Sequence, residues 1–325
     1  MTETSTAPVL PDAKLKMVPV SEPVTGVIVS NDSCLRGKSA SFVRHTEIDI
    51  SGTPLENNCL AGQAFGVLAP GEDEKGNPHK VRLYSLACPS AGEDGAGKVI
   101  STTTKRVIDE QVPQDEGDNP EDHRLFLGVC SNFLCDLRPG DEVKVTGPNG
   151  KRFLFPVHTE EHDYLFVATG TGIAPFRGMI MELLVRSAEP SSSQIHLLMG
   201  TPYTTDLIYD DLFTRLAAEH DNFHYHTAIS RETQADGSPG LYVHHLLDRR
   251  FDEFSSLLGN SRTLVYICGL AGMQSGVFQT LARHGLADGY FTIKSPLADT
   301  DPDDWDLKQI RRAVKIAARC MVEVY

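Results

Sequence analysis

The chain has 325 residues and a formal net charge of -14, with 40% hydrophobic and 23% charged residues. This length favours two domains with separate cores. The acidic balance argues against a nucleic-acid partner, because phosphates demand lysine and arginine. No apolar run is long enough to cross a bilayer, and residues 1–20 lack the pattern of a secretory signal, so we expect a cytoplasmic location. A plastid or membrane-associated location stays open.

The seven cysteines form no Cys-x-x-Cys pair and have no histidine partner at zinc spacing. We therefore expect neither an iron–sulfur cluster nor a bound metal in this chain. Scattered single thiols are typical of a reducing compartment. Any one-electron centre would then belong to a partner. The cysteines are Cys34, Cys59, Cys88, Cys130, Cys135, Cys268 and Cys320.

The first half of the chain predicts a tail and then a β domain. Residues 1–22 offer little apolar surface to offset the entropy of ordering, which predicts a flexible tail. Residues 23–157 contain short β-prone segments separated by turn residues, which predict an antiparallel barrel or sandwich. The acidic stretch 109–122 predicts a loop. The predicted strands cover 41–50, 64–68, 81–86, 98–107 and 142–146.

The sequence pattern changes after Pro156, in the second half of the chain (residues 158–325). Apolar runs alternate with helical patterns, which predicts βαβ units on a parallel, doubly wound sheet. The segments are 164–169, 175–186, 195–200, 207–219, 223–229, 263–268 and 273–284.

Two motifs in the β domain carry chemistry suited to a diphosphate. In the strand Arg82-Leu83-Tyr84-Ser85, alternation places Arg82 and Tyr84 on one face. A guanidinium binds diphosphate oxygens as a rigid fork and a phenol packs on a planar ring, although a plain strand would also carry such residues. The segment 128–134 follows a strand and opens a helix, whose free N–H groups suit a diphosphate; an ordinary N-cap is the alternative.

Three motifs in the α/β domain suit a second nucleotide. Gly170-Thr171-Gly172 joins a strand to a helix, where a backbone approaches a diphosphate closely; a simple tight turn is the alternative. Ser230-Arg231 follows a strand at its carboxyl end, where a solvated surface loop is the alternative. An arginine there would supply charge for a 2′-phosphate, which favours NADP over NAD. The segment 268–273 ends a further strand and begins a helix, which is otherwise typical of a buried thiol at a turn.

The carboxyl-terminal segment predicts one long helix. Asp301 and Pro302 are typical of a helix start. Apolar residues at helical spacing should face the core, namely Leu307, Ile310, Val314 and Ala317. A separate basic stripe consists of Lys308, Arg312, Lys315 and Arg319.

Together with the terminal Val322-Glu323-Val324-Tyr325, these motifs resemble the plant-type ferredoxin-NADP(H) reductases, from about residue 24 to residue 325. The resemblance implies a β-barrel that binds FAD, followed by an α/β domain that binds NADP(H). It implies hydride transfer between NADPH and FAD, and single-electron transfer to ferredoxin or flavodoxin, in either direction. The hydride and electron chemistry would belong to FAD, while the protein contributes position and electrostatics.

The resemblance also implies a role for individual residues. The FAD contacts would come from Arg82, Tyr84, Ser85, Lys105, Gly128, Val129, Cys130, Ser131 and Tyr325. The NADP contacts would come from Thr171, Gly172, Ser230, Arg231, Tyr242, Cys268 and Gly269. The residues at the reacting centre would be Ser85, Cys268, Glu323 and Tyr325, with Glu323 hydrogen bonded to Ser85 and the Tyr325 ring over the flavin.

Two positions depart from the family pattern. Asp109 stands where the family usually has a tyrosine on the FAD adenine, and Gly240 stands where it has a basic residue near Tyr242. The basic stripe is a candidate docking site for an acidic carrier, with a solvated helix face as the alternative. A reductase that feeds an oxygenase and a flavin-binding regulatory subunit are the alternative functions. Retention of all four reacting-centre residues argues against the regulatory subunit.

Overall fold

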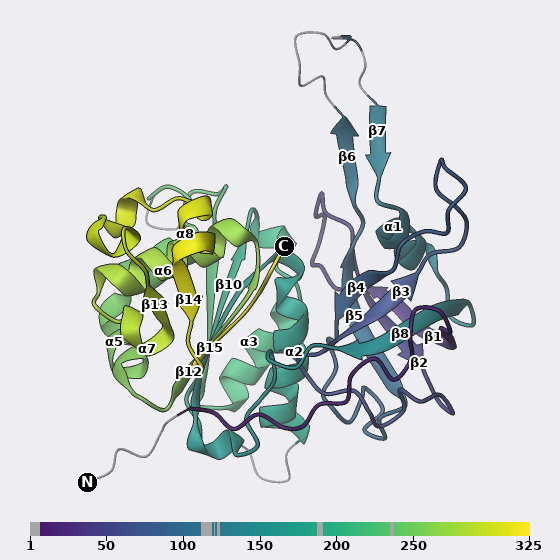
Figure 1. Ribbon diagram of the computed structural model, residues 1–325, viewed down its shortest axis with the longest axis horizontal. Coiled ribbons are helices and arrows are strands. Elements are labelled where there is room, and N and C mark those ends of the chain that lie inside the picture. Colours follow the sequence, from purple (N-terminus) through teal and green to yellow (C-terminus); the bar gives the residue numbers. More distant parts are fainter. Residues whose placement is uncertain (1–6, 112–118, 120, 122–123, 187–190, 235–236) are drawn as a thin grey trace.

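The computed structural model describes residues 7–325, apart from 112–118, 120, 122–123, 187–190 and 235–236. Two bodies lie side by side in Figure 1, an antiparallel sheet and a parallel sheet covered by helices. Within these described residues, no helix is long and apolar enough to span a membrane.

The first body is an antiparallel β-barrel. Its six strands pair in the order β4-β3-β8-β1-β2-β5, and a bridge between Leu86 and Thr102 joins the two edges of the sheet. Ile48, Phe65 and Val145 are fully buried in its core. The elements are β1 (Val24–Ser33), β2 (Val43–Asp49), β3 (Ala64–Leu68), β4 (Arg82–Ser85), β5 (Val99–Lys105), α1 (Val129–Asp136) and β8 (Glu142–Asn149).

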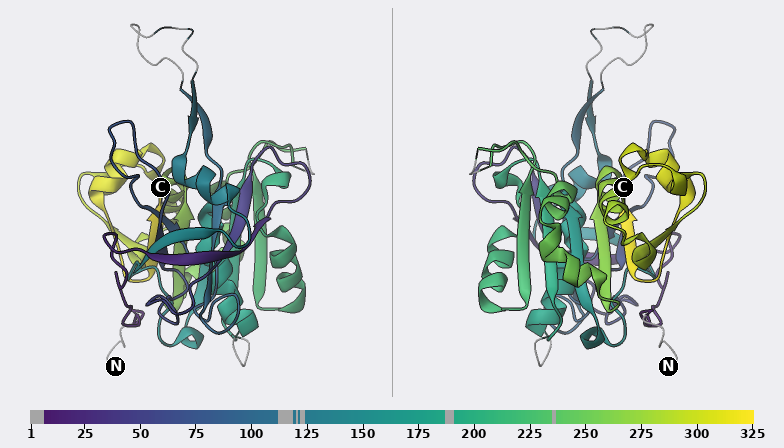
Figure 2. Two further views of the ribbon diagram at one scale, coloured as in Figure 1. Left: turned by 90° about the vertical axis from the view of Figure 1, so that its right-hand side faces the viewer. Right: turned by 90° about the vertical axis from the view of Figure 1, so that its left-hand side faces the viewer.

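A hairpin of β6 (Ile108–Gln111) and β7 (Arg124–Leu127) projects from the barrel (Figures 1 and 2). The prediction of a loop from residue 109 is therefore wrong for 109–111, while most of the acidic stretch beyond lies outside the described residues. The acidic composition hid this strand because its pairing partner is the apolar β7. Asp109 lies directly opposite Phe126, so their side chains share one face of the hairpin.

The second body is a doubly wound α/β domain. Its five parallel strands run in the order β11-β10-β9-β12-β15, so the order reverses between β9 and β12. Tyr164 and Phe166 of β9 face one helical layer, and Leu165 and Val167 face the other. The strands are β9 (Asp163–Thr169), β10 (Ile195–Thr201), β11 (Phe223–Ile229), β12 (Thr263–Gly269) and β15 (Cys320–Val324). The helices are α2 (Ala174–Met181), α3 (Asp210–Glu219), α4 (Val243–Arg249), α5 (Phe251–Gly259), α6 (Ala271–Arg283) and α7 (Ala287–Tyr290).

The predicted long carboxyl-terminal helix is wrong in its extent. Helix α8 (Leu307–Ala313) begins after Asp306, which forms a capping box with Gln309, and a 3-10 turn (Pro302–Asp304) precedes it. The β-branched segment that follows forms β14 (Val314–Ile316), which pairs with β13 (Phe291–Ile293). Of the four apolar residues predicted to face the core, only Ile310 is fully buried.

The basic stripe is divided by the same change. Lys308 and Arg312 lie on α8, and Lys315 lies on β14. Arg319 donates hydrogen bonds to the carbonyls of Asn260 and Thr263 at 3.0 and 3.3 Å, and its guanidinium lies over the Tyr290 ring. Arg319 is thus a structural residue. The prediction that it belongs to one exposed helical stripe with Lys308, Arg312 and Lys315 is wrong.

Part of the predicted flexible tail is fixed to the body. The Lys16 N–H donates to the Pro148 carbonyl at 2.8 Å, and the Val18 N–H donates to the Gly147 carbonyl at 2.9 Å. Val18 is only 3% exposed. The apolar side chain of Val18 thus supplies the burial that the tail's composition appeared to lack, and residues 16–18 pair with the end of β8.

The two domains meet along α2. Arg177 forms an ion pair with Glu93 of the barrel domain, and the two side chains are only 12% and 10% exposed. Arg177 also donates to the Ala87 carbonyl at 2.8 Å. One residue further on, an ideal Cβ on Gly178 would lie 2.2 Å from the Cys88 carbonyl oxygen. Glycine at position 178 therefore allows backbone contact between the domains.

A hydrogen-bonded tyrosine reinforces this interface. The Tyr209 hydroxyl lies 2.8 Å from His45 Nδ1 and 2.6 Å from Thr103 Oγ1, both in the barrel.

Burial alone would raise the pKa of the Glu93 carboxyl, but His45 and Arg177 beside it lower that pKa to about 2. Glu93 is consequently ionised in the folded protein at neutral pH.

Candidate functional site

A cavity of about 800 Å³ lies where β9, β10, β11 and β12 end. It sits at the reversal of strand order, the position where open α/β sheets bind ligands. Thr171, Arg231, Tyr242 and Tyr325 are among the residues that line it. We call this cavity the switch-point pocket. It brings together residues from all three nucleotide motifs of the α/β domain.

Glycines allow the loops of the pocket to approach one another. An ideal Cβ on Gly172 would lie 2.2 Å from the Cys268 carbonyl oxygen. Gly269 has a φ of +137°, and its ideal Cβ would lie 2.3 Å from Thr169 Oγ1. The Leu270 N–H donates to the same oxygen at 2.9 Å. The predicted glycine turns are thus required by backbone contact between β9 and β12.

Ser230 and Arg231 line another part of the pocket. Their N–H groups donate to the carbonyls of Thr201 and Pro202, both at 2.9 Å, which fixes the loop after β11. An ideal Cβ on Gly240 would lie 2.2 Å from the Ser230 carbonyl oxygen. The close approach of the Gly240 backbone to the Ser230 carbonyl leaves no room for a side chain, which explains why residue 240 is glycine where the family has a basic residue. Among the residues that the structure describes, Arg231 has no carboxylate partner, which leaves its charge available to a ligand.

Sequence reasoning missed two pocket residues and placed a third differently. His244 and His245 lie two and three residues after Tyr242 and line the pocket, and the Tyr242 and His244 rings are nearly parallel at 5.7 Å. Burial lowers the pKa of His244 to about 4, so its ring is neutral at pH 7. The unusual His-His pair was a signal that could have been used. Lys105, expected at FAD, also lines this pocket from the barrel.

Some of the expected FAD residues lie together on the barrel, whereas Lys105 and Tyr325 line the switch-point pocket. Tyr84 of β4 contacts Cys130 of α1, so the arginine strand and the start of α1 are neighbours. No side chain caps α1 at Gly128, where an ideal Cβ would lie 2.7 Å from Ser131 Oγ. The first N–H groups of α1, at Val129 and Cys130, are therefore free for an anion. This uncapped helix start beside Arg82 fits the diphosphate of FAD.

Ser131 acts mainly within the protein. Its hydroxyl accepts a hydrogen bond from the Val107 N–H at 3.2 Å and donates to the Gly128 carbonyl at 3.1 Å. These bonds join the helix start to the base of the hairpin. Ser131 thus positions the loop that precedes the free N–H groups.

Three of the reacting-centre residues, Cys268, Glu323 and Tyr325, lie in the α/β domain, and Ser85 lies on β4 of the barrel. Cys268 and Glu323 are paired positions on β12 and β15. An ideal Cβ on Gly150 of the barrel would lie 3.8 Å from Glu323 Oε1. Burial raises the pKa of Glu323 to about 7. In the described part of the chain, the Glu323 and Ser85 side chains are not hydrogen bonded to each other, so that implied pair is not present in this state.

A barrel with an uncapped helix start, beside a doubly wound domain with a pocket at the reversal of strand order, is the arrangement expected of a two-domain, nucleotide-dependent oxidoreductase. Residues 166–279 match the model of the oxidoreductase NAD-binding domain. A ferredoxin–NADP reductase from Plasmodium falciparum has the same fold, with a TM-score of 0.68 and 22% identity over 96% of this chain and 99% of that one.

Curated relatives are more similar in sequence. The chain is 37% identical to the root-type chloroplastic ferredoxin–NADP reductase of Nicotiana tabacum, over 84% of this chain and 72% of that protein. It is 34% identical to the ferredoxin–NADP reductase of Spirulina sp, over 97% of this chain and 99% of that protein. The chain belongs to the ferredoxin–NADP reductase family.

Proposed function

We propose that this protein is a ferredoxin–NADP(H) reductase, which moves electrons between NADP(H) and the one-electron carrier ferredoxin. Family membership, with FAD and NADP(H) as the cofactors of the family, supports this function. The observation that supports it is the switch-point pocket at the reversal of strand order, which is lined by Thr171, Arg231 and Tyr325. Flavodoxin as a second carrier and a cytoplasmic location stay predictions.

The barrel would hold FAD through Arg82 and the start of α1. The guanidinium and the free N–H groups of Val129 and Cys130 are suited to the two phosphates of one diphosphate. Tyr84 would pack against the isoalloxazine ring. When bound, FAD supplies the redox chemistry, because it accepts a hydride and releases electrons singly.

The switch-point pocket would hold NADP(H). Arg231 and Ser230 would bind the 2′-phosphate, and Tyr242 would stack on the adenine. Lys105 reaches the same pocket from the barrel and supplies a second positive charge for the phosphates. The nicotinamide would lie toward Cys268 and Tyr325.

Glu323 would take up and release a proton near the reacting centre. Because burial raises its pKa to about 7, this carboxyl exchanges a proton within the physiological range. Cys268 is buried, and burial raises the pKa of its thiol well above the usual range, so it stays a neutral contact group and not a nucleophile.

The function is tested with the purified protein and a plant-type ferredoxin. We expect a yellow protein that releases FAD on denaturation, and NADPH-dependent reduction of cytochrome c that requires ferredoxin. Reduction of ferricyanide should proceed without ferredoxin. FMN in place of FAD, or full cytochrome c reduction without ferredoxin, would contradict the proposal.

The hairpin supplies a replacement for the missing adenine-stacking tyrosine. Phe126 lies opposite Asp109, is 48% exposed, and precedes the helix start at Gly128 by two residues. We expect Phe126→Ala to weaken FAD binding by the apoprotein about five- to a hundred-fold, because stacking of a base on an aromatic ring contributes roughly 1 to 3 kcal/mol. Isothermal titration of the apoprotein with FAD measures this.

FMN provides the control for this prediction, because it lacks the adenine. Phe126→Ala should leave FMN affinity unchanged, and Leu125→Ala, on the other face of the hairpin, should leave FAD affinity unchanged. An equal loss for FAD and FMN would show that Phe126 acts on the fold and not on the adenine.

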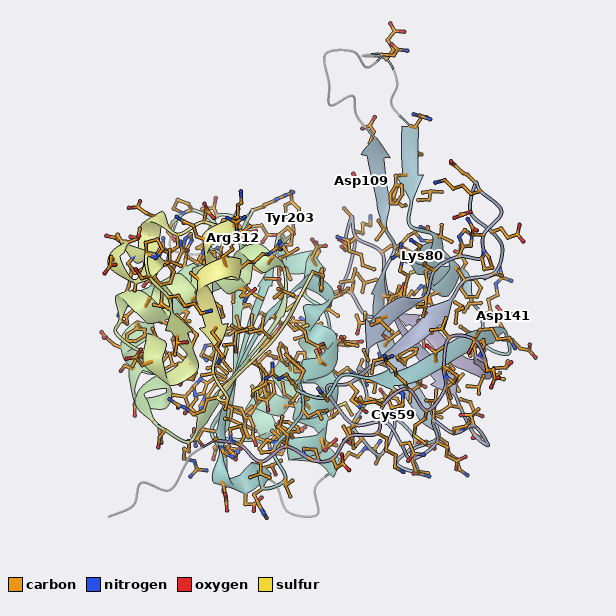
Figure 3. The ribbon with its side chains drawn as sticks, in the orientation of Figure 1. Cys59, Lys80, Asp109, Asp141, Tyr203 and Arg312 are labelled. Atoms are coloured by element: carbon orange, nitrogen blue, oxygen red, sulfur yellow. The ribbon has the colours of Figure 1, made fainter. Side chains whose placement is uncertain are left out.

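The basic stripe without Arg319, that is Lys308, Arg312 and Lys315, is the proposed docking site for ferredoxin. Arg312 lies on α8 (Figure 3). Lys315 lies on the adjoining β14, and both side chains are exposed. Because the Debye length is about 8 Å at physiological salt, an acidic partner senses this local face more than the net charge. Reversing Arg312 and Lys315 to glutamate should slow ferredoxin-dependent cytochrome c reduction and weaken its salt dependence.

Reversal of Arg138 and Lys144 to glutamate makes the same change in net charge on the barrel. That variant should keep the parent rate and salt dependence, and ferricyanide reduction should stay intact in both variants. Equal slowing by both pairs would mean that ferredoxin responds to overall charge and not to this face.

A further inference from the structure

Three histidines lie together beneath helix α5, on one face of the parallel sheet. His196 lies on β10, and His224 and His226 lie on the neighbouring edge strand β11. The His196 and His226 rings are parallel at 5.6 Å, and the His224 ring lies 4.4 Å from that of His196. Phe254 of α5 packs edge-on against His196 and His226, at 5.5 and 5.3 Å. The His196 and His226 pair is therefore enclosed between the sheet and α5.

Hydrogen bonds determine where the protons of this pair lie. Arg250 Nη1 lies 3.0 Å from His226 Nδ1, and because a guanidinium can only donate, His226 Nδ1 must be unprotonated. The proton of His226 is then on Nε2, which lies 3.3 Å from His196 Nδ1. His226 thus donates to His196, whose Nδ1 must also be unprotonated. This hydrogen-bonded chain from Arg250 through His226 to His196 exists only while both rings are neutral.

The surroundings also disfavour a charge on either ring. Burial lowers the pKa of His196 to about 3, and the neighbouring His224, His226 and Arg250 act in the same direction. Burial, followed by the Arg250 charge, lowers the pKa of His226 to about 4. Glu253 is the carboxylate that opposes these effects, and it is held in an ion pair with Arg250. A proton on either ring would therefore meet a hydrogen-bond donor and a nearby positive charge.

The pair joins three elements of the α/β domain, namely β10, β11 and α5. We propose that the His196 and His226 pair is an acid-sensitive joint: a proton on either ring breaks the chain and loosens α5 and β11, so the α/β domain opens before the barrel when the medium becomes acidic. β11 leads into the loop of Ser230 and Arg231, so opening would also disturb that side of the switch-point pocket. The joint itself does not depend on which nucleotide the pocket binds.

The active pH interval follows from the protonation of the folded and unfolded chains. An unfolded histidine has a pKa of about 6.5, above the folded values of about 3 and about 4. The stability that the pair contributes is therefore complete above pH 6.5 and is lost as the pH falls toward 4, because the unfolded chain binds more protons there. Each histidine should raise the unfolding equilibrium constant by up to about ten-fold per pH unit in this interval.

The first test observes the two rings in the parent protein labelled with nitrogen-15. Two-bond proton–nitrogen spectra should show His196 and His226 as neutral Nε2–H tautomers from about pH 8 to about pH 5.5. Each ring is assigned by the signal that disappears in His196→Asn or His226→Asn. A histidine-containing peptide in the same sample supplies the reference titration.

The second test compares unfolding of the parent with that of His196→Asn. The asparagine Oδ1 can replace Nδ1 as the acceptor, but it does not titrate. Trp305 is the single tryptophan and is buried in the α/β domain, so its fluorescence in urea follows this domain. Between pH 6.5 and 5, the unfolding constant of the parent should rise up to about ten-fold more per pH unit than that of His196→Asn. The control His158→Asn, at a side chain that is 62% exposed, should keep the parent slope.

Amide hydrogen exchange at pH 5 shows where the parent opens. Exchange should be faster in the parent than in His196→Asn within β11 and α5, and equal in β3 of the barrel. Three results would overturn the inference: an Nδ1–H or charged form of either ring at neutral pH, equal pH slopes for the parent and His196→Asn, or equal exchange in β11 and α5. If His196→Asn did not fold, the tautomers and the titration of the parent would still decide.

Discussion

Replacing Arg231 by alanine should raise the KM for NADPH about ten- to hundred-fold, because a hydrogen bond to a charged group contributes roughly 1.5 to 3 kcal/mol. The residue lines the switch-point pocket from a loop whose backbone is fixed by Thr201 and Pro202. The lost contact is with the 2′-phosphate alone, so the KM for NADH should change little. Steady-state ferricyanide reduction with each nucleotide measures both values.

Arg215→Ala is the matched control, since Arg215 pairs with Glu219 on the surface of α3, outside the pocket lining. It should leave both KM values at the parent level. If Arg231→Ala impaired NADPH and NADH equally, the loop after β11 would not be the 2′-phosphate site, and the preference for NADP would need another origin.

Replacing Arg177 by leucine should lower the free energy of unfolding by about 3 to 5 kcal/mol, because it removes the arginine partner of the buried Glu93 carboxylate. The same pair joins the two domains, so hydride transfer from NADPH should also slow. Urea denaturation followed by flavin and tyrosine fluorescence measures the stability, and stopped-flow flavin bleaching measures the transfer. Arg215→Ala, which breaks an exposed pair, should cost only about 0.3 to 0.5 kcal/mol.

The pH dependence gives a second readout of the pair. The folded-state pKa of Glu93 is about 2, below the ordinary value of 4.5. Its contribution to stability is therefore present above pH 4.5 and is lost as the pH falls from 4.5 toward 2. Glu93→Gln should remove this contribution, so its stability should fall less steeply than that of the parent over that interval. Parallel curves would show that other carboxylates dominate acid unfolding.

Sequence patterns predicted the fold well where they were strongly periodic or bounded by turn residues. The strands 64–68 and 223–229 have the predicted limits, and the parallel sheet and the barrel are both confirmed. The patterns failed where a partner far along the chain decides the structure. Val18 is ordered by Gly147, and the acidic β6 is ordered by the apolar β7, neither of which local composition reveals.

The carboxyl-terminal segment failed for a related reason. Helical spacing at Val314 is equally compatible with a strand, and pairing with β13 decides in favour of the strand. Within the site, motifs identified the residues of the switch-point pocket, but not their mutual contacts. The hydrogen bond between the Thr171 and Tyr325 hydroxyls joins positions that are 154 residues apart, and no local pattern predicts it.

Gly178 has a consequence for the separation of the two domains. Its backbone lies so close to the Cys88 carbonyl that an added methyl carbon would have to sit 2.2 Å from that oxygen. At this point of the interface the two domains are therefore held at the distance of two main chains in contact, with no side chain between them. Side-chain variation elsewhere along the interface can alter how firmly the domains adhere, but a single methyl group at this position would alter how far apart they stand.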